Sequence, residues 1–220
     1  MKNDAQTKND PETLGYSDHM RYRRILRHAT QAFLTHGYAG TAVEDIAIDA
    51  NVSKVTIYRL FVDKLGLATD VLHDLSSSLE MHCRHAIDMA APAEDCLVHF
   101  GVTYVKWMIK NIGTTHHYAV SRLLMEMSTS HPDFAHSWVE SHTRVIVLPL
   151  SQYIQKRIEL GELSGEEDSF FMAAQFLGNL IHTPGIIVLN HNLAIAYNVD
   201  DIAALVKRKV RLFLRGWQKR

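Results

Sequence analysis

Helical periodicity over almost the whole chain is the feature that most constrains the fold. After Asp18, apolar residues recur at spacings of three and four, which is the pattern of amphipathic helices, whereas half-buried strands alternate with a period of two. With 220 residues, 47% of them hydrophobic, the chain can bury a substantial core. The sequence therefore predicts an all-α protein of about nine helices.

Turn, capping and breaking residues mark where these helices begin and end. Gly37 ends the first helix at a C′ position, the pair Thr41 and Glu44 predicts a capping box for the second, and Asp63 caps the fourth. Pro149 predicts a kink or a split in the seventh. The longer helices are expected over residues 19–36, 115–129, 132–160, 168–189 and 199–217.

Charge is distributed unevenly along the chain. The formal net charge is −1, yet residues 19–61 hold six basic side chains against three acidic ones. A basic module on an acidic body is typical of a protein in which the module alone binds a polyanion. The predicted domains are a disordered lead-in over residues 1–18, a module over residues 19–66, and a larger helical domain over residues 67–220.

The cellular location is predicted from what the sequence lacks. Cys83 and Cys96 do not make a disulfide framework and both fall in helical patterns, which is typical of reduced thiols in a cytosolic protein. No apolar run has the length of a membrane span, and the polar N-terminus has no signal-peptide core. We expect a cytoplasmic protein without a membrane partner.

The stretch TAVEDIAIDANVSKVTIYRLFVDK meets the requirements of a helix-turn-helix. Ala47 is the small residue where the two helices cross, and Asn51 supplies a turn residue that tolerates a positive φ. Apolar residues at helical spacing hold the second helix against the first: Ile46, Ala50, Val52, Ile57 and Phe61. The other face of the second helix is rich in hydrogen-bond donors, which predicts that it enters a DNA major groove.

Residues 24–67 resemble the N-terminal DNA-binding domain of TetR-family transcriptional repressors. The similarity lies in AFLTHGY, Thr41, the DIA triplet, VSKVTIYRLF and Lys64; further on, HPDFAHSWVE and GELSGEEDSFFMAAQFLGNL look like one subgroup of the family's C-terminal domains. Two positions depart from the family pattern, because Asn51 replaces the usual turn glycine and Leu60 stands where a polar residue is common.

The resemblance implies roles for individual side chains. Arg59 can fork onto guanine, while Val55 and the Thr56 methyl group can touch a thymine methyl. Lys64 adds its charge to the positive N-terminal end of a helix, where a phosphate is favoured. The complete predicted DNA-binding set is Thr41, Ser53, Lys54, Val55, Thr56, Tyr58, Arg59 and Lys64.

The resemblance also implies an effector cavity and a dimer interface in the larger domain. The predicted effector-binding residues are Phe100, Tyr104, Trp107, Met108, Met127 and Trp138. The predicted dimer interface consists of Phe171, Ala174, Leu177, Gly178, Ile181, Ile202, Leu205, Val206, Phe213 and Trp217. We expect a homodimeric repressor that a small, mostly apolar effector releases from a pseudo-palindromic DNA operator.

Other functional classes are weighed on the same residues. His82 and His85 could share a zinc ion, with Cys83 turned partly away, but HExxH and CxxC motifs are absent. Ordinary surface or pocket histidines are the better interpretation of these residues and of the pair at positions 116 and 117. We expect no metal, no cofactor and no enzymatic activity, because Gly-x-Ser-x-Gly and phosphate-binding glycine loops are missing. The alternative is a helical metal-binding, ligand-binding or scaffold protein without an operator, which a DNA-binding assay at varied salt distinguishes.

Overall fold

The computed structural model of the chain describes residues 14–112, 119–190 and 202–217, and all regular elements in these ranges are helical. This confirms the all-α prediction. The chain divides into two compact units. The first consists of Met1–Leu75 and Ala119–Ala135, and the second of Ser76–Tyr118 and His136–Arg220. The predicted boundary at residue 66 separates DNA binding from effector binding, which a division by compactness does not test, so it stays a prediction.

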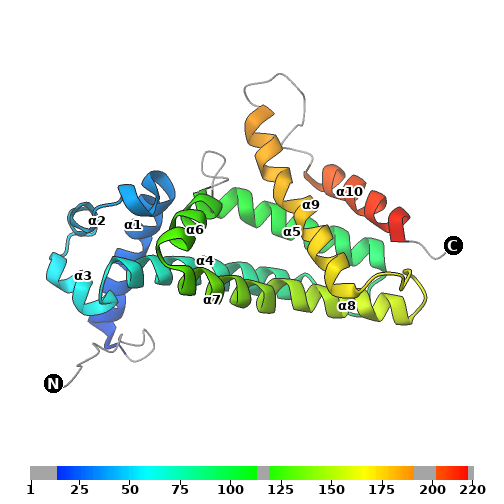
Figure 1. The fold of residues 1–220 in the computed structure, drawn as a ribbon, viewed down its shortest axis with the longest axis horizontal. Helices are drawn as coiled ribbons and strands as arrows, with labels where there is room; N and C mark the ends of the chain where they lie inside the picture. The colour runs from blue at the N-terminus through cyan, green and yellow to red at the C-terminus, as the bar shows by residue number, and fades with distance from the viewer. Residues whose placement is uncertain (1–13, 113–118, 191–201, 218–220) are drawn as a thin grey trace. The chain divides into compact units, whose positions relative to one another are not determined.

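The N-terminal unit is a small helical bundle in which α6 packs along α1 (Figure 1). Its elements are α1 (Tyr16–Gly40), α2 (Val43–Asp49), α3 (Lys54–Phe61), the first half of α4 (Lys64–His85), α6 (Ala119–Ser130) and the start of α7 (Pro132–His142). Apolar side chains from α1, α2 and α3 meet in its core. The largest fully buried ones are Ile25, Phe33, Ile46, Ile57, Leu60 and Phe61. Burial of these residues is the main force that holds the short helices α2 and α3 in place.

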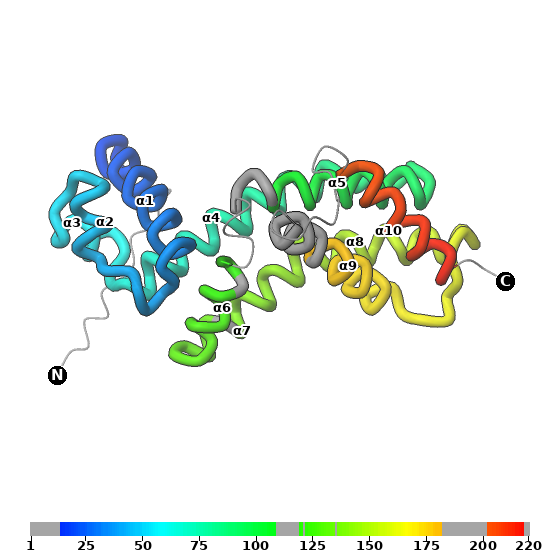
Figure 2. Tube along the Cα trace, turned by 90° about the horizontal axis from the view of Figure 1, so that it is seen from above, coloured from blue at the N-terminus to red at the C-terminus, as the bar shows by residue number. Residues whose placement is uncertain are grey.

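The second unit packs longer helices around a continuous apolar core. It holds the remainder of α4 and α7 together with α5 (Ala93–Ile112), the π-helical segment η2 (Thr143–Val147), α8 (Leu148–Glu159), α9 (Ser169–Asn190) and α10 (Ile202–Trp217). Helix α10 runs along α5, and α9 packs on α8 and α5 (Figure 2). The α5–α10 approach is close because Gly101 has no side chain: a Cβ there would lie 2.7 Å from Cγ1 of Val206.

Most predicted helix boundaries agree with the structure. Gly37 has φ +74° and interrupts α1 where the sequence predicts a helix end, after which the chain makes one more turn to Gly40. Asp63 caps α4, because its carboxylate accepts a hydrogen bond from the Gly66 amide over 2.7 Å. Helix α1 begins at Tyr16 instead of residue 19, so it includes the last three residues of the predicted lead-in. Residues 1–13 of the lead-in and residues 115–118 lie outside the described residues.

The predicted capping box of α2 is wrong. The residue at the N-cap is Ala42, and α2 has no side-chain cap. The hydroxyl of Thr41 donates instead to the carbonyl of Gly37 over 2.7 Å, and the carboxylate of Glu44 pairs with Lys54. Thr41 thus bonds back to the end of α1, four residues earlier, and Glu44 pairs with a residue of α3, so neither side chain caps α2.

The predicted break near Pro149 is present as a change of helix type. Between α7 and α8 the backbone of η2 widens, and the amide of Leu148 donates to the carbonyl of Thr143, five residues earlier. Proline cannot donate to the helical ladder and its ring crowds the carbonyl four residues before it. The π-helical turn accommodates this, and Pro149 then lies in the first turn of α8, where proline is tolerated.

Candidate nucleic-acid interface

The turn between α2 and α3 has the geometry that the sequence predicts. Asn51 adopts φ +49°, the left-handed conformation for which a turn glycine is otherwise used. The amide of Val52 donates to the carbonyl of Ala47 over 3.0 Å, which closes the turn. Ala47 itself is buried where the helices cross. Asn51 therefore replaces the family's glycine without changing the path of the chain.

Helix α3 has one buried face and one exposed face. Ser53 caps its start, since the Ser53 hydroxyl accepts a hydrogen bond from the Thr56 amide over 3.1 Å. Phe61 stacks on Tyr22 of α1 with ring centroids 4.8 Å apart. Leu60 is buried, so the residue that departs from the family pattern serves the core. The exposed face carries Lys54, Val55, Tyr58 and Arg59, with 76% of Val55 accessible to solvent.

The two cations on this exposed face are each paired with a carboxylate. Arg59 donates two hydrogen bonds of 2.8 Å to Asp18 of α1, and Lys54 forms an ion pair with Glu44 of α2. The Glu44 partner raises the pKa of Lys54, and the Asp18 partner raises that of Arg59, so both side chains stay positively charged. The sequence does not predict a role for Asp18, and it assigns Glu44 to a cap.

Two predicted phosphate contacts lie beside the helix-turn-helix. The side chain of Thr41 is 4% exposed and its hydroxyl is already donated to Gly37. Lys64, in the first turn of α4, places its ammonium 4.7 Å from the centre of the Tyr38 ring. Partial burial lowers the pKa of Lys64. Both assignments stay predictions, and Lys64 has the more accessible side chain of the two.

Helix α6 is attached to α1 at the Gly37 break. The carboxylate of Glu126 accepts hydrogen bonds from the amides of Tyr38 over 2.6 Å and Ala39 over 3.3 Å. Arg122 donates to the carbonyl of Leu34 over 3.0 Å. These side chains satisfy backbone groups that the break in α1 leaves without helical partners. A sequence separation of 88 residues between Glu126 and Tyr38 leaves no local pattern from which the contact could be predicted.

Five of the six predicted effector residues belong to the second unit, and Met127 belongs to the first. Phe100, Tyr104 and Trp107 are buried on α5, and Met108 and Trp138 are half-buried. Trp138 stacks on His142 with centroids 5.0 Å apart. Within the described part of the chain, the buried indole Nε1 of Trp138 has no hydrogen-bond partner. The effector assignment stays a prediction.

The predicted dimer residues differ in exposure within one chain. On α9, Phe171 and Ile181 are 49% and 37% exposed. Ala174 is also exposed to solvent. Four of the other predicted residues are half-buried: Gly178, Ile202, Leu205 and Trp217. The remaining three are buried: Leu177, Val206 and Phe213. The last three pack in the core of the protomer, so a second chain can contact only the others directly.

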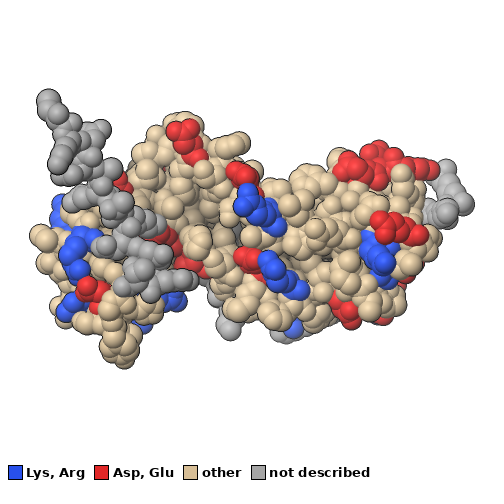
Figure 3. Space-filling model, turned by 90° about the horizontal axis from the view of Figure 1, so that it is seen from below, with Lys and Arg blue, Asp and Glu red and all other residues tan. Residues whose placement is uncertain are grey.

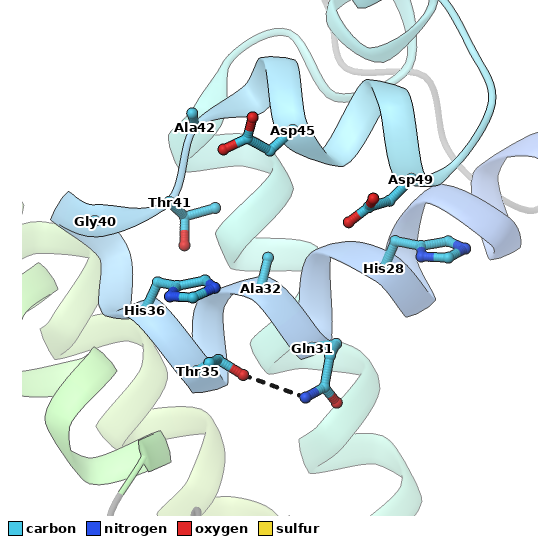
Figure 4. Close-up of a pocket in the computed structure, with 10 residues that line it drawn as sticks. All are labelled: His28, Gln31, Ala32, Thr35, His36, Gly40, Thr41, Ala42, Asp45 and Asp49. Carbon is cyan, nitrogen blue, oxygen red and sulfur yellow. Dashed lines mark hydrogen bonds between the residues drawn. The ribbon is translucent and has the colours of Figure 1, made fainter.

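A pocket of about 140 Å³ lies between α1 and α2 (Figure 4). His28 and His36 of α1 face Asp45 and Asp49 of α2 across it. The predicted effector residues do not line this pocket. Among the described residues, no group of three or more histidine, cysteine or acidic side chains could hold a metal ion.

The histidines of the HCRH motif bond to their own helix. His82 Nδ1 lies 2.7 Å from the carbonyl of Ser78, and His85 Nδ1 lies 2.6 Å from that of Met81. Positions 116 and 117 fall outside the described residues. None of the helices in the described part of the chain has the length and apolarity of a membrane span.

Two protein-family models match the chain. The model described as "Bacterial regulatory proteins, tetR family" matches residues 25–71, and "AefR-like transcriptional repressor, C-terminal domain" matches residues 96–219. The second match alone covers more than half of the chain, and the first contains the helix-turn-helix described above.

Curated relatives and solved structures agree with these matches. YvkB of Bacillus subtilis, an HTH-type transcriptional regulator, is 43% identical over 56 residues, which are 26% of this chain and 30% of YvkB. YhgD of the same organism is 26% identical over 145 residues, 66% of this chain and 71% of YhgD. The repressor DhaR of Mycobacterium sp. strain GP1 is 36% identical over 58 residues, 26% of this chain and 29% of DhaR. The chain thus spans less than a third of YvkB and of DhaR.

Similar folds are found over nearly the full length of the chain. A tetR-family regulatory protein from Rhodococcus RHA1 has 18% identity and a TM-score of 0.70, covering 91% of this chain and 98% of that one. FadR of Bacillus subtilis, in complex with stearoyl-CoA, has 18% identity and a TM-score of 0.72, covering 89% and 98%. At these identities the likeness concerns the fold alone. With the two family matches and the helix-turn-helix geometry, it follows that the chain belongs to the TetR family and is a DNA-binding transcriptional regulator.

Proposed function

We propose that this regulator is a homodimeric repressor that reads a pseudo-palindromic operator with α3 and leaves it when a small, mostly apolar effector binds. The observation that carries the proposal is the division of α3 into a buried apolar face and an exposed face with Val55, Tyr58 and two cations. Val55 and Arg59, one turn apart on this face, present an apolar group and a guanidinium together, which suits a thymine methyl near a guanine.

Base reading and phosphate binding are distinguished by different residues. Arg59→Ala removes a side chain that can fork onto guanine, and it should cost about 1–3 kcal/mol on the operator and relax the preference at one position. Lys64→Ala removes a point charge near a helix N-terminus, and it should weaken binding to all sequences and flatten the salt slope by about one unit. Equal losses on operator and random DNA for Arg59→Ala would refute base reading by this residue.

The dimer is supported by exposed apolar residues on α9. Phe171 and Ile181 are large and solvent-accessible in one chain, and a face of this kind is typically covered by a partner. Two helix-turn-helix units are needed because one reads too few base pairs for useful specificity. Phe171→Glu together with Ile181→Glu should yield monomers in analytical ultracentrifugation. These positions are preferred to the buried Leu177, because a charge there would unfold the protomer as well.

The effector class follows from the side chains of α5 and α7. The predicted residues on α5 are aromatic or sulfur-containing, which favours an apolar ligand. The Trp138 indole N–H, buried and without a described partner, favours a ligand with one hydrogen-bond acceptor. Burial lowers the pKa of the stacked His142, so its imidazole is neutral at pH 7 and adds no charge. FadR, which is similar in fold, is described in complex with stearoyl-CoA, an acyl ligand.

The test measures operator affinity against a library of small apolar compounds. Compounds with an acceptor group should weaken operator binding by about 1–3 kcal/mol, the usual coupling between two sites. Trp138→Phe keeps an aromatic side chain, although a smaller one, and removes the N–H, so it should reduce the response to those compounds and spare operator affinity in their absence. If every compound that binds the protein leaves operator affinity unchanged, the effector part of the proposal is wrong.

A further inference from the structure

Both cations on the exposed face of α3 are held by carboxylates from the two preceding helices. Nη1 of Arg59 donates to Oδ2 of Asp18 and Nη2 donates to Oδ1, each over 2.8 Å. Lys54 is paired with Glu44 in the same way from α2. On the face of the N-terminal unit drawn at the left of Figure 3, acidic side chains accordingly lie among the basic ones. These two of the predicted DNA contacts are thus already engaged by acids in the free protein.

The Arg59–Asp18 pair imitates the contact that Arg59 would make with DNA. An arginine fork donates two parallel hydrogen bonds to O6 and N7 of guanine, or to two oxygens of a phosphate. Asp18 accepts from both terminal nitrogens of that fork. DNA can therefore engage the same two nitrogens together only by displacing the carboxylate, and every mode of DNA binding that uses this fork starts from the same broken ion pair.

The carboxylate remains charged under the conditions of DNA binding. Hydrogen bonds from Arg59 and then from Arg21 hold the pKa of Asp18 at about 2. The Arg21 contact measures 2.9 Å and lies on the same helix, so it fixes the carboxylate at the start of α1. Once displaced from Arg59, Asp18 stays beside the DNA as a negative charge that repels phosphates.

We propose that Asp18 is an autoinhibitory residue, which competes with DNA for the fork of Arg59 and so lowers the affinity of the helix-turn-helix for the operator and for random DNA alike. The inference rests on the proposed function of α3 as the base-reading helix. On random DNA, exchange of Asp18 for a phosphate replaces one ion pair by another. On the operator, the exchange is accompanied by insertion of the whole exposed face of α3, including Val55 and Tyr58, which adds contacts that random DNA lacks but leaves the cost of breaking the pair the same.

The test compares Asp18→Asn with the matched control Asp74→Asn. Both variants remove one negative charge from an exposed ion pair of the N-terminal unit, but Asp74 pairs with Arg23 of α1 over 2.7 Å, which lies outside α3. Asparagine keeps the shape of the side chain, and circular dichroism checks the fold. Affinity is measured at several salt concentrations on an operator selected from a random oligonucleotide pool and on random-sequence duplex of equal length.

Asp18→Asn should bind both the operator and random duplex about five- to ten-fold more tightly near 0.1 M salt, with a salt slope steeper by about one. Asp74→Asn should change either affinity by about two-fold or less. When Arg59→Gln is also present, Asp18→Asn should lose most of its effect. Unchanged affinity of Asp18→Asn on both DNAs, or an equal gain for Asp74→Asn, would overturn the inference while leaving base reading intact. A wild-type chain without sequence preference would overturn the proposed function and this inference with it.

Discussion

The attachment of α6 to α1 gives a prediction that can be followed at single backbone amides. At Gly37 the backbone leaves the helical conformation, so the amides of Tyr38 and Ala39 begin a new turn without acceptors four residues earlier. Glu126 supplies the acceptor, over 2.6 Å to Tyr38 and 3.3 Å to Ala39. Glu126→Ala removes it, and both amides are then left to water or to transient partners.

The size of the effect follows from the geometry and exposure of the contact. A hydrogen bond to a charged group contributes about 1.5–3 kcal/mol, and partial access of water reduces this. The Glu126 side chain is 35% exposed, and one of its two bonds is long. We therefore expect a loss of about 1–2 kcal/mol, which corresponds to roughly five- to thirty-fold faster hydrogen exchange at the Tyr38 amide.

The assay is hydrogen exchange by NMR at Tyr38 and Ala39 in three variants. Glu126→Gln keeps an acceptor oxygen but loses the charge, so its exchange rates should lie between those of the wild type and Glu126→Ala. Glu140→Ala is the control, because Glu140 is an exposed acid whose ion pair is with Arg144, four residues later, and does not involve α1. Unchanged exchange at Tyr38 and Ala39 in Glu126→Ala would refute the reasoning, since the amides would then be protected by something other than this carboxylate.

Three further outcomes follow from single sites. Arg157 is buried and donates hydrogen bonds to the carbonyls of Met89 and Ala91 and to the carboxylate of Glu162. Arg157→Met should therefore lower the free energy of unfolding, measured in urea, by about 2–4 kcal/mol. A loss below about 0.5 kcal/mol would contradict a structural role for Arg157. Val62 has φ +69° and ψ −59° in a tight turn, a strained conformation for a β-branched residue, so Val62→Gly should raise the melting temperature, with a gain of about 0.5–1 kcal/mol. Burial raises the pKa of Cys83 to about 12, so maleimide should label this thiol only when the chain opens, and rapid labelling in native buffer would show that the site is not closed.

The helix-turn-helix could be predicted from the sequence because its requirements are local. A left-handed turn residue, a small crossing residue and a helical stripe all fall within about two dozen positions, and Asn51 and Ala47 occupy the predicted places. Gly37 and Pro149 were predicted for the same reason, since each changes the backbone at its own position. The predicted capping box is wrong because two other bonds compete with it: Thr41 bonds back to the carbonyl of Gly37, four residues earlier, and Glu44 pairs with Lys54 of α3.

The contacts of Asp18 and Glu126 could not be predicted because the residues that they bind are distant in sequence. Asp18 lies 41 residues before Arg59, and Glu126 lies 88 residues after Tyr38. Side-chain pairs at such separations depend on how α1, α3 and α6 pack, and the hydrophobic pattern that sets the packing is indifferent to which exposed residue is acidic. Residues 19–61 have more basic than acidic side chains, yet in the structure both cations of α3 form ion pairs with carboxylates. Each of these cations must exchange its carboxylate for a phosphate or a base when DNA binds. The excess of basic residues in the sequence therefore overstates the electrostatic attraction of this face to DNA.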